Sequence, residues 1–162
     1  MYRIDNIDFE IVNMLMEDGR MRAAEIARRL GSKSERAVRY RIDRMIDNNV
    51  IRLSAIVNPK GLGMNVVADV LLEVDSDSIL DVANKMAEFE NVSYVACSIG
   101  ETDISVQVLA GDTSEVYRFV TEVIGKIPGV RKTTTSIVPL VVKDVFQWRI
   151  PTSLVNENLN EE

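Results

Sequence analysis

The chain has 162 residues, of which 46% are hydrophobic and 27% charged, and its formal net charge is −6. It contains no histidine and a single cysteine, Cys97, which excludes histidine-dependent nucleophilic catalysis, nearly every zinc site and an internal disulfide. We therefore expect no enzyme, no metal site and no cofactor, and the absence of a secretory leader or of an apolar run of about 20 residues predicts a cytoplasmic protein outside the membrane.

Positive charge is concentrated in one part of this acidic chain. Residues 20–52 carry 10 basic and 4 acidic side chains, a net charge of +6, whereas residues 53–162 have a net charge of −8. Such asymmetry points to a polyanionic partner for the basic part alone. The alternative is a solvated helix face, and the order and spacing of the residues have to decide between the two.

Three helices are predicted in the basic part, over residues 5–18, 23–30 and 35–48. Apolar residues recur at three- and four-residue spacing, and Asp5 or Asn6 can cap the first helix. The predicted inward-facing positions of the first and third helices are Ile4, Ile7, Ile11, Met14, Leu15, Val38, Ile42, Met45 and Ile46.

The second and third helices form a helix-turn-helix pattern, joined by a short turn that contains Gly31. Ser34 is the expected N-cap of the third helix, and Asn49 suits a left-handed residue after it. The outer face of the third helix carries arginines, and a helix of this width fits the major groove of DNA. The candidate DNA contacts are Lys33, Ser34, Glu35, Arg36, Arg39, Tyr40, Arg44 and Arg52.

Some of these basic residues have simpler explanations. Arg41 lies nearer the predicted core and can pair with an acid such as Asp8 instead of contacting DNA. Arg28 and Arg29 can be the solvated side of the second helix. Residues 50–57 alternate enough to form a strand or the β-ribbon wing that often follows such a helix.

Pro59, Gly61 and Gly63 mark a hinge, and the pattern beyond it changes to strands and helices in the order β-α-β-β-α-β. Ser76 and Ser114 are the expected helix caps. The predicted strands are 66–74, 93–99, 104–110 and 132–142, and the predicted helices are 77–89 and 115–126.

An internal repeat supports this order. A shift of 38 residues aligns Val82 with Val120 and Met86 with Ile124. Two βαβ units related in this way predict a ferredoxin-like fold with four antiparallel strands and both helices on one face. The other face is then expected to expose apolar surface, which suggests face-to-face dimerisation. Cys97 falls in a strand that we expect to be buried, where packing is its simplest role.

The loop from Gly100 to Asp103, with the sequence GETD, links the two halves of the repeat. Backbone N–H groups beside a glycine, together with carboxylates, could hold the two charged ends of a small zwitterion. An acidic turn that contains glycine can also do no more than reverse the chain. The Thr133–Ser136 run can equally reflect the high β-propensity of threonine.

Residues 4–143 resemble the Lrp/AsnC family of transcription regulators. The resemblance is carried by IDNIDFEIVNML, EDGRMRAAEIA, SERAVRYRIDRM and NVIRLSAIVNPKGLG in the basic part, and by GETDISVQV and PGVRKTTTSIVPLVVK in the acidic part. The turn after Gly31 is one residue longer than is usual in the family, and Asn49 replaces the usual glycine.

The resemblance implies an α+β protein with an N-terminal winged helix-turn-helix and a C-terminal ferredoxin-like βαββαβ effector domain. It implies double-stranded DNA as a partner, homodimers that often assemble into octamers, and a small-molecule effector, with an amino acid expected. Gly100 and Asp103 match the family's ligand loop. The other effector-site candidates, chosen by proximity, are Glu101, Thr102, Thr133 and Thr135.

The expected domains are the winged helix-turn-helix at 1–54, the hinge at 55–65, the effector and oligomerisation domain at 66–143, and a C-terminal extension at 144–162. In the extension we expect an edge strand over 144–151 and then a disordered acidic tail. Two alternatives remain: an architectural DNA-binding protein without an effector, and a protein like the sirohaem decarboxylases, which share this architecture but are expected to use histidine.

Overall fold

The computed structural model describes residues 2–31 and 34–156. The chain forms two compact units, and Met1–Ile56 together with Lys143–Glu162 make up the first. Val57–Val142 make up the second, so the chain passes between the units twice. Among the described residues, no helix is both long enough and apolar enough to cross a membrane.

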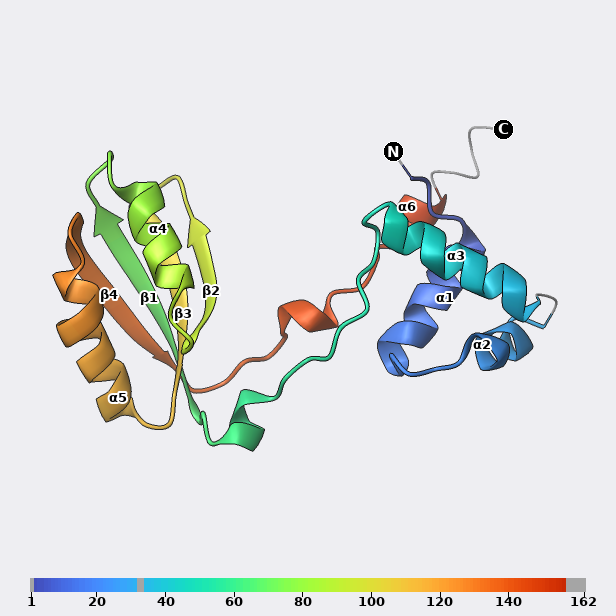
Figure 1. The fold of residues 1–162 in the computed structure, drawn as a ribbon, viewed down its shortest axis with the longest axis horizontal. Coiled ribbons are helices and arrows are strands. Elements are labelled where there is room, and N and C mark those ends of the chain that lie inside the picture. Colours follow the sequence, from blue (N-terminus) through green and yellow to red (C-terminus); the bar gives the residue numbers. More distant parts are fainter. Residues whose placement is uncertain (1, 32–33, 157–162) are drawn as a thin grey trace. The chain divides into compact units, whose positions relative to one another are not determined.

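Three helices form the first unit: α1 (Asn6–Glu17), α2 (Ala23–Arg29) and α3 (Glu35–Asp47) (Figure 1). Asp5 caps α1 as predicted: its side chain accepts from the Asp8 N–H, at 2.8 Å, in a reciprocal capping box. The helices enclose one apolar core, and seven of the nine predicted inward positions lie in it or pack against it. Ile46 is wrong: it is 38% exposed, on the solvent side of α3. The buried members of the core are Ile11, Val12, Leu15, Ile26, Ala27, Val38 and Met45.

The end of α3 follows the predicted pattern, but the segment after it does not. Asn49 adopts a left-handed conformation with φ of 56°. Residues 50–58 form no strand, although we expected a strand or β-ribbon wing there. A strand needs a hydrogen-bonding neighbour, and within the described residues the sheet belongs entirely to the second unit. The 3-10 helix η1 (Pro59–Leu62) then leads to that unit.

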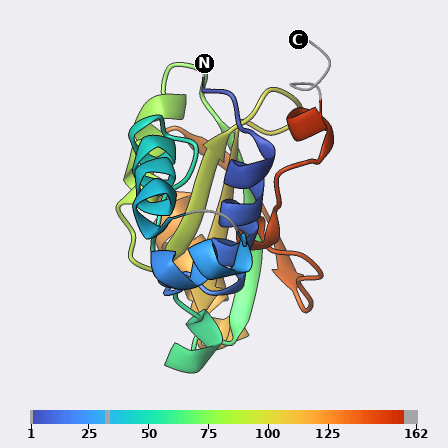
Figure 2. The same cartoon turned by 90° about the vertical axis from the view of Figure 1, so that its right-hand side faces the viewer.

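The second unit has the predicted ferredoxin-like order. One antiparallel sheet has the strand order β2-β3-β1-β4. Both main helices cover the same face of this sheet (Figures 1 and 2). The elements are β1 (Val66–Val74), α4 (Ile79–Ala87), β2 (Val92–Cys97), β3 (Ile104–Ala110), α5 (Thr113–Arg118) and β4 (Val130–Val138).

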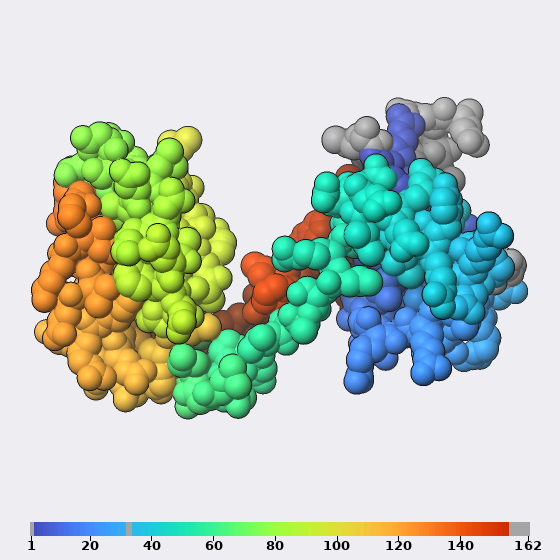
Figure 3. Space-filling model, viewed as in Figure 1, coloured from blue at the N-terminus to red at the C-terminus, as the bar shows by residue number. Residues whose placement is uncertain are grey.

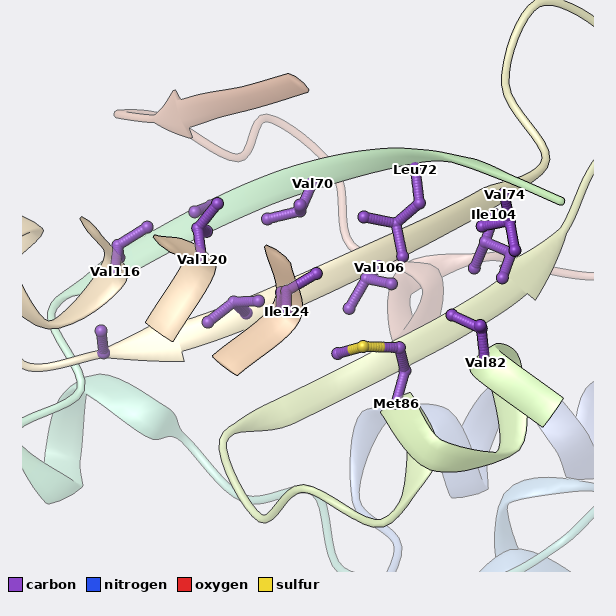
Figure 4. Close-up of a cluster of buried hydrophobic side chains, with 13 residues drawn as sticks. Val70, Leu72, Val74, Val82, Met86, Ile104, Val106, Val116, Val120 and Ile124 are labelled. Carbon is purple, nitrogen blue, oxygen red and sulfur yellow. The ribbon is translucent and has the colours of Figure 1, made fainter. Parts of the chain in front are cut away.

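The core of the second unit lies between the sheet and its helices (Figure 4). Every second residue of β3, from Ile104 to Ala110, is buried, as period-two alternation requires. The repeat is visible in the packing, because Val82 and Met86 occupy the core alongside their repeat partners Val120 and Ile124.

The helix starts differ from the predicted ones. The N-cap of α4 is Ser78, not Ser76, and its side chain makes no capping hydrogen bond. The N-cap of α5 is Asp112, whose carboxylate accepts from the Glu115 N–H at 2.9 Å, so Ser114 lies inside the helix. Aspartate caps at least as well as serine, and the earlier residue starts the helix. The helical path then continues through a π-helical turn and a 3-10 turn to residue 126.

The uncovered face of the sheet is more polar than predicted. Leu71 is 37% exposed there, but Asp69 and Glu73 flank it on β1. Glu73 pairs with Lys132 at 2.7 Å. Cys97 is exposed, contrary to the prediction, because it is the last residue of the edge strand β2.

The C-terminal segment belongs to the first unit. The edge strand predicted over 144–151 is wrong: the segment contains a 3-10 helix, η4 (Val145–Gln147), and is followed by the short helix α6 (Ser153–Asn156). Ile150 packs against the core of the helical unit, and Val155 is only 4% exposed. The segment packs on the helices of this unit, where the described residues offer no strand for it to pair with. The disordered tail predicted after residue 151 is wrong for Ser153–Asn156, which form α6, and residues 157–162 lie outside the described residues.

Candidate nucleic-acid interface and effector loop

The start of α3 presents polar groups to solvent. Ser34 is its N-cap, and the hydroxyl oxygen accepts from the Ala37 N–H at 3.1 Å, as predicted. Lys33, another candidate DNA contact, lies outside the described residues. The exposed residues of this face are Glu35, Arg36, Arg39, Tyr40, Asp43 and Arg44. In the space-filling view, α3 lies on the near side of its unit, where no other described element of that unit covers it (Figure 3).

Arg39 is held by an ion pair within its own helix. Its Nε donates to Oε1 of Glu35 at 3.0 Å, one turn earlier. The side chains of Arg39 and Glu35 are 68% and 47% exposed, and such exposed pairs contribute only about 0.3–0.5 kcal/mol. The pair therefore orients the Arg39 side chain but is weak enough for a DNA phosphate to displace the Glu35 carboxylate.

Arg41 makes contacts of a different kind. Its Nη1 donates to Asp5 Oδ2 at 2.7 Å and to Asp8 Oδ1 at 2.8 Å, and the Asp8 side chain is only 2% exposed. Burial alone would lower the pKa of Arg41, but the hydrogen bonds and charges of Asp8 and Asp5 outweigh it and raise the pKa. This pairing is the predicted alternative to a DNA contact, and it holds α3 against the start of α1.

Arg44 lies between two aromatic rings. Its Cζ is 5.2 Å from the ring centroid of Tyr2 and 5.6 Å from that of Tyr40. The Tyr2 hydroxyl donates to Asp8 Oδ2 at 2.9 Å. Tyr2 is absent from the candidates chosen from sequence, because it precedes the acidic helix α1 and no local pattern relates it to α3.

The arginines of α2 form a local cluster on the solvated side of that helix, the alternative considered above. Arg28 and Arg29 both donate to Glu25, at 2.7 Å and 3.0 Å. These hydrogen bonds lower the pKa of Glu25 from 4.5 to about 2. Arg52 is exposed in the irregular segment after α3, and it does not lie on the strand or β-ribbon wing predicted there.

The loop from Gly100 to Asp103 is tied to the end of β1. Asp103 donates its N–H to the Leu72 carbonyl at 2.9 Å, and its Oδ2 accepts from the Val74 N–H at 2.7 Å. Arg131, which the sequence did not single out, places Nη2 3.9 Å from the same carboxylate oxygen. Asp103 thus has a structural role in addition to any role in binding.

The other effector candidates are divided between two places. Thr102 is in the loop, where its carbonyl accepts from the Ser98 hydroxyl at 2.9 Å, and Glu101 is exposed beside it. Thr133 is opposite Leu72 in the β1–β4 register, close to the loop. Thr135 is opposite Val70 and lines a shallow, mainly apolar hollow between α5 and β4. The lining residues of this hollow are Thr113, Val116, Tyr117, Val120, Thr121, Thr135 and Ile137.

Two family models match the chain, one for each unit. Residues 4–46 match the AsnC-type helix-turn-helix domain, and residues 67–147 match the Lrp/AsnC ligand binding domain. An HTH-type transcriptional regulator of Pyrococcus furiosus, whose own role is uncharacterized, is 37% identical over 141 residues, which cover 86% of this chain and 95% of that protein. The regulator FL11 of Pyrococcus abyssi is 34% identical over 148 residues, which cover 91% and 97%.

Solved structures share the fold. Escherichia coli AsnC superposes with a TM-score of 0.81 at 24% sequence identity, over 90% of this chain and 99% of that one. A transcriptional regulator of Neisseria meningitidis, solved as a complex with L-Met, gives a TM-score of 0.80 at 22% identity, over 87% and 93%. At these identities the likeness establishes the α+β architecture of a helix-turn-helix with a ferredoxin-like domain.

Proposed function

Because this chain belongs to the Lrp/AsnC family of DNA-binding transcription regulators, we propose that it reads duplex DNA with α3 and adjusts that binding to a small-molecule effector held by its sheet unit. The observation that carries the DNA half of the proposal is the exposed outer face of α3. Within the described residues, its guanidinium groups are either free of carboxylates or held in exposed pairs that a phosphate can replace. We assign residues 1–54 to DNA binding, 55–65 to the hinge and 66–143 to effector binding and assembly.

The charge distribution favours the same assignment. The net charge of +6 on residues 20–52 attracts phosphates, whereas the net charge of −8 on residues 53–162 keeps the rest of the chain away from them. With Arg41 fastened to α1, the proposed contacts are Arg36, Arg39, Arg44 and Arg52, accompanied by Lys33, Ser34, Glu35 and Tyr40. The N-terminal part of α3 would read base edges, and the flanking arginines would hold phosphates.

The test starts by selecting bound fragments from a random DNA pool, which supplies the operator sequence. The double variant Arg36→Ala/Arg39→Ala should then lose several kcal/mol of binding free energy, at about 1–3 kcal/mol per arginine. Arg118→Ala/Lys126→Ala is the matched control, because it removes two positive charges from the other unit. Equal affinities for the wild type and the Arg36/Arg39 variant would exclude α3 as the reading helix.

For the effector we propose an amino acid bound near the Gly100–Asp103 loop. The loop offers carboxylates for an ammonium group and backbone N–H groups for a carboxylate. The L-Met complex of the Neisseria protein is a precedent for such a ligand. Glu101, Thr102, Thr133 and Thr135 complete the proposed site, with Thr135 farthest from the loop.

Calorimetry against the common amino acids tests the effector proposal. Asp103→Asn keeps an oxygen for the Val74 N–H but removes the charge, so it should abolish the heat of binding and leave DNA affinity intact. Asp77→Asn, an exposed acid elsewhere in the unit, is the control. If no amino acid gives heat or changes the assembly, the architectural alternative without an effector holds.

We also propose that the chain forms homodimers through the uncovered face of the sheet, with octamers as the larger assembly. Leu71 and its polar neighbours would be buried between two copies. Replacing Leu71 with aspartate should give monomers in light scattering, because it would bury four carboxylates at the centre of the two-fold contact, one introduced side chain and one Asp69 from each copy. A dimer that persists in this variant would place the interface elsewhere.

A further inference from the structure

Tyr2 lies outside the residues matched by the helix-turn-helix family model, which begins at residue 4, yet it contacts the outer face of α3. Its ring packs against the core of the helical unit. Its hydroxyl donates to Asp8 Oδ2, at 2.9 Å, and its ring lies 5.2 Å from Cζ of Arg44. Tyr2 therefore connects the buried carboxylate of α1 to an arginine on the proposed DNA-binding surface.

We infer that Tyr2 is a positioning residue for DNA recognition: it holds the Arg44 guanidinium against its ring, so that Arg44 meets the duplex already oriented and fully charged. The inference rests on the proposed function of α3. Tyr2 itself need not touch DNA.

The way in which Arg44 is held separates it from Arg39 and Arg41. Arg39 pairs with an exposed carboxylate that a phosphate has to displace, and Arg41 is held by Asp5 and the buried Asp8. In the part of the chain that the structure describes, no ion pair joins Arg44 to a carboxylate, and its contacts are the rings of Tyr2 and Tyr40. A ring attracts a cation through its quadrupole and leaves the net charge in place, so the full charge remains for a phosphate.

The anchoring of Tyr2 explains why it can act as a fixed support. Asp8 is 2% exposed, and it accepts from Arg41 with one oxygen and from Tyr2 with the other. Burial raises the pKa of Tyr2, and the hydrogen bond to Asp8 adds to the effect, so the hydroxyl stays protonated and keeps donating at neutral pH. Without this support, Arg44 would lose more rotamer freedom on binding DNA, and the affinity would fall.

A double-mutant cycle on the full chain tests the inference, with the fragments selected above as the DNA probe and fluorescence anisotropy as the measurement. Tyr2→Leu should weaken DNA binding by about three- to tenfold when Arg44 is present. In the Arg44→Ala background the same change should have an effect of less than about twofold. Tyr2→Phe, which keeps the ring but loses the hydrogen bond to Asp8, should rescue part of the loss.

Each outcome bears on the inference. If Tyr2→Leu lowers DNA affinity equally in both backgrounds, Tyr2 acts only through the fold. If it lowers affinity in neither, Arg44 needs no support from Tyr2. Either result overturns the inference. Thermal unfolding of each variant shows whether the helical unit is intact, and Tyr2→Met replaces Tyr2→Leu if the latter fails to fold. Failure of the proposed function is distinguishable, because the Arg36→Ala/Arg39→Ala variant would then bind like the wild type.

Discussion

Asp8 is the residue on which several contacts of the helical unit converge. It is 2% exposed, and its carboxylate accepts from Arg41 at 2.8 Å and from Tyr2 at 2.9 Å. Asp8→Asn leaves the Arg41 guanidinium with a poorer partner in a half-buried place, and we expect a loss of about 2 kcal/mol in the free energy of unfolding of this unit. Urea unfolding followed by circular dichroism measures it.

The matched control is Asp5→Asn, which also removes a charge that faces Arg41. The Asp5 side chain is 52% exposed, and asparagine caps a helix as well as aspartate does, so the control should cost much less. Similar losses in the two variants would show that the burial of the Asp8 carboxylate adds nothing to the strength of its pairing with Arg41.

Asp5 also makes the helical unit sensitive to acid. Burial alone would raise the pKa of Asp5, but the Asp8 N–H and the Arg41 guanidinium outweigh it and lower the pKa below its ordinary value of 3.8. The folded state favours the charged form of Asp5, so ionised Asp5 adds to the free energy of unfolding. This stabilisation is complete above pH 3.8, the ordinary pKa, and is lost as the pH falls through the lower pKa of the folded state. We expect the melting temperature of the wild type to fall more steeply below this pH than that of Asp5→Asn; parallel curves would refute the assignment.

The C-terminal segment is a structural element of the helical unit. Val155 is 4% exposed and Ile150 packs against the helical core. Val155→Ala should cost about 1.5 kcal/mol of the stability of that unit, since two buried methyl groups are lost. Val145→Ala makes the same substitution at a residue that is 77% exposed, and it should have almost no effect. Differential scanning calorimetry measures both variants. Equal melting temperatures would show that the C-terminal segment does not stabilise the helical unit.

Several elements whose cause is local could be predicted from the sequence, although the caps of α4 and α5 were each placed two residues away from the observed ones. The cap at Asp5, the cap at Ser34 and the left-handed Asn49 follow from side-chain chemistry within a few residues. The ferredoxin-like order follows from the repeat. The sequence pattern missed the elements whose partners are distant: the apolar residues of the C-terminal segment alternate like a strand, and only the helical core decides where they pack.

The same distinction applies to the candidate site. The exposed face of α3 follows from helical periodicity, and so does the suspicion that Arg41 pairs with Asp8. Tyr2 and Arg131 were missed because each joins its site from another part of the sequence, through a ring contact with Arg44 in one case and an approach to Asp103 in the other. Neither contact has a spacing that a single sequence could reveal.

At the scale of the whole molecule, the segregation of charge makes a prediction about salt. Binding through arginines releases counterions, and the logarithm of the association constant falls linearly with the logarithm of salt concentration, with a slope of about −0.9 for each phosphate neutralised. Arg36→Ala/Arg39→Ala should flatten that slope by about 1 to 2, depending on how many of the two arginines meet phosphates and how many meet bases.

The control for this experiment is again Arg118→Ala/Lys126→Ala. It lowers the net charge of the chain by the same amount, so a general effect of charge would flatten the slope equally in both variants. If DNA lies only against the helical unit, the control keeps the wild-type slope, because counterions are released only where phosphates are contacted. If the control flattens the salt slope as much as the α3 variant does, the duplex also contacts the acidic unit, and DNA binding cannot be assigned to the helical unit alone.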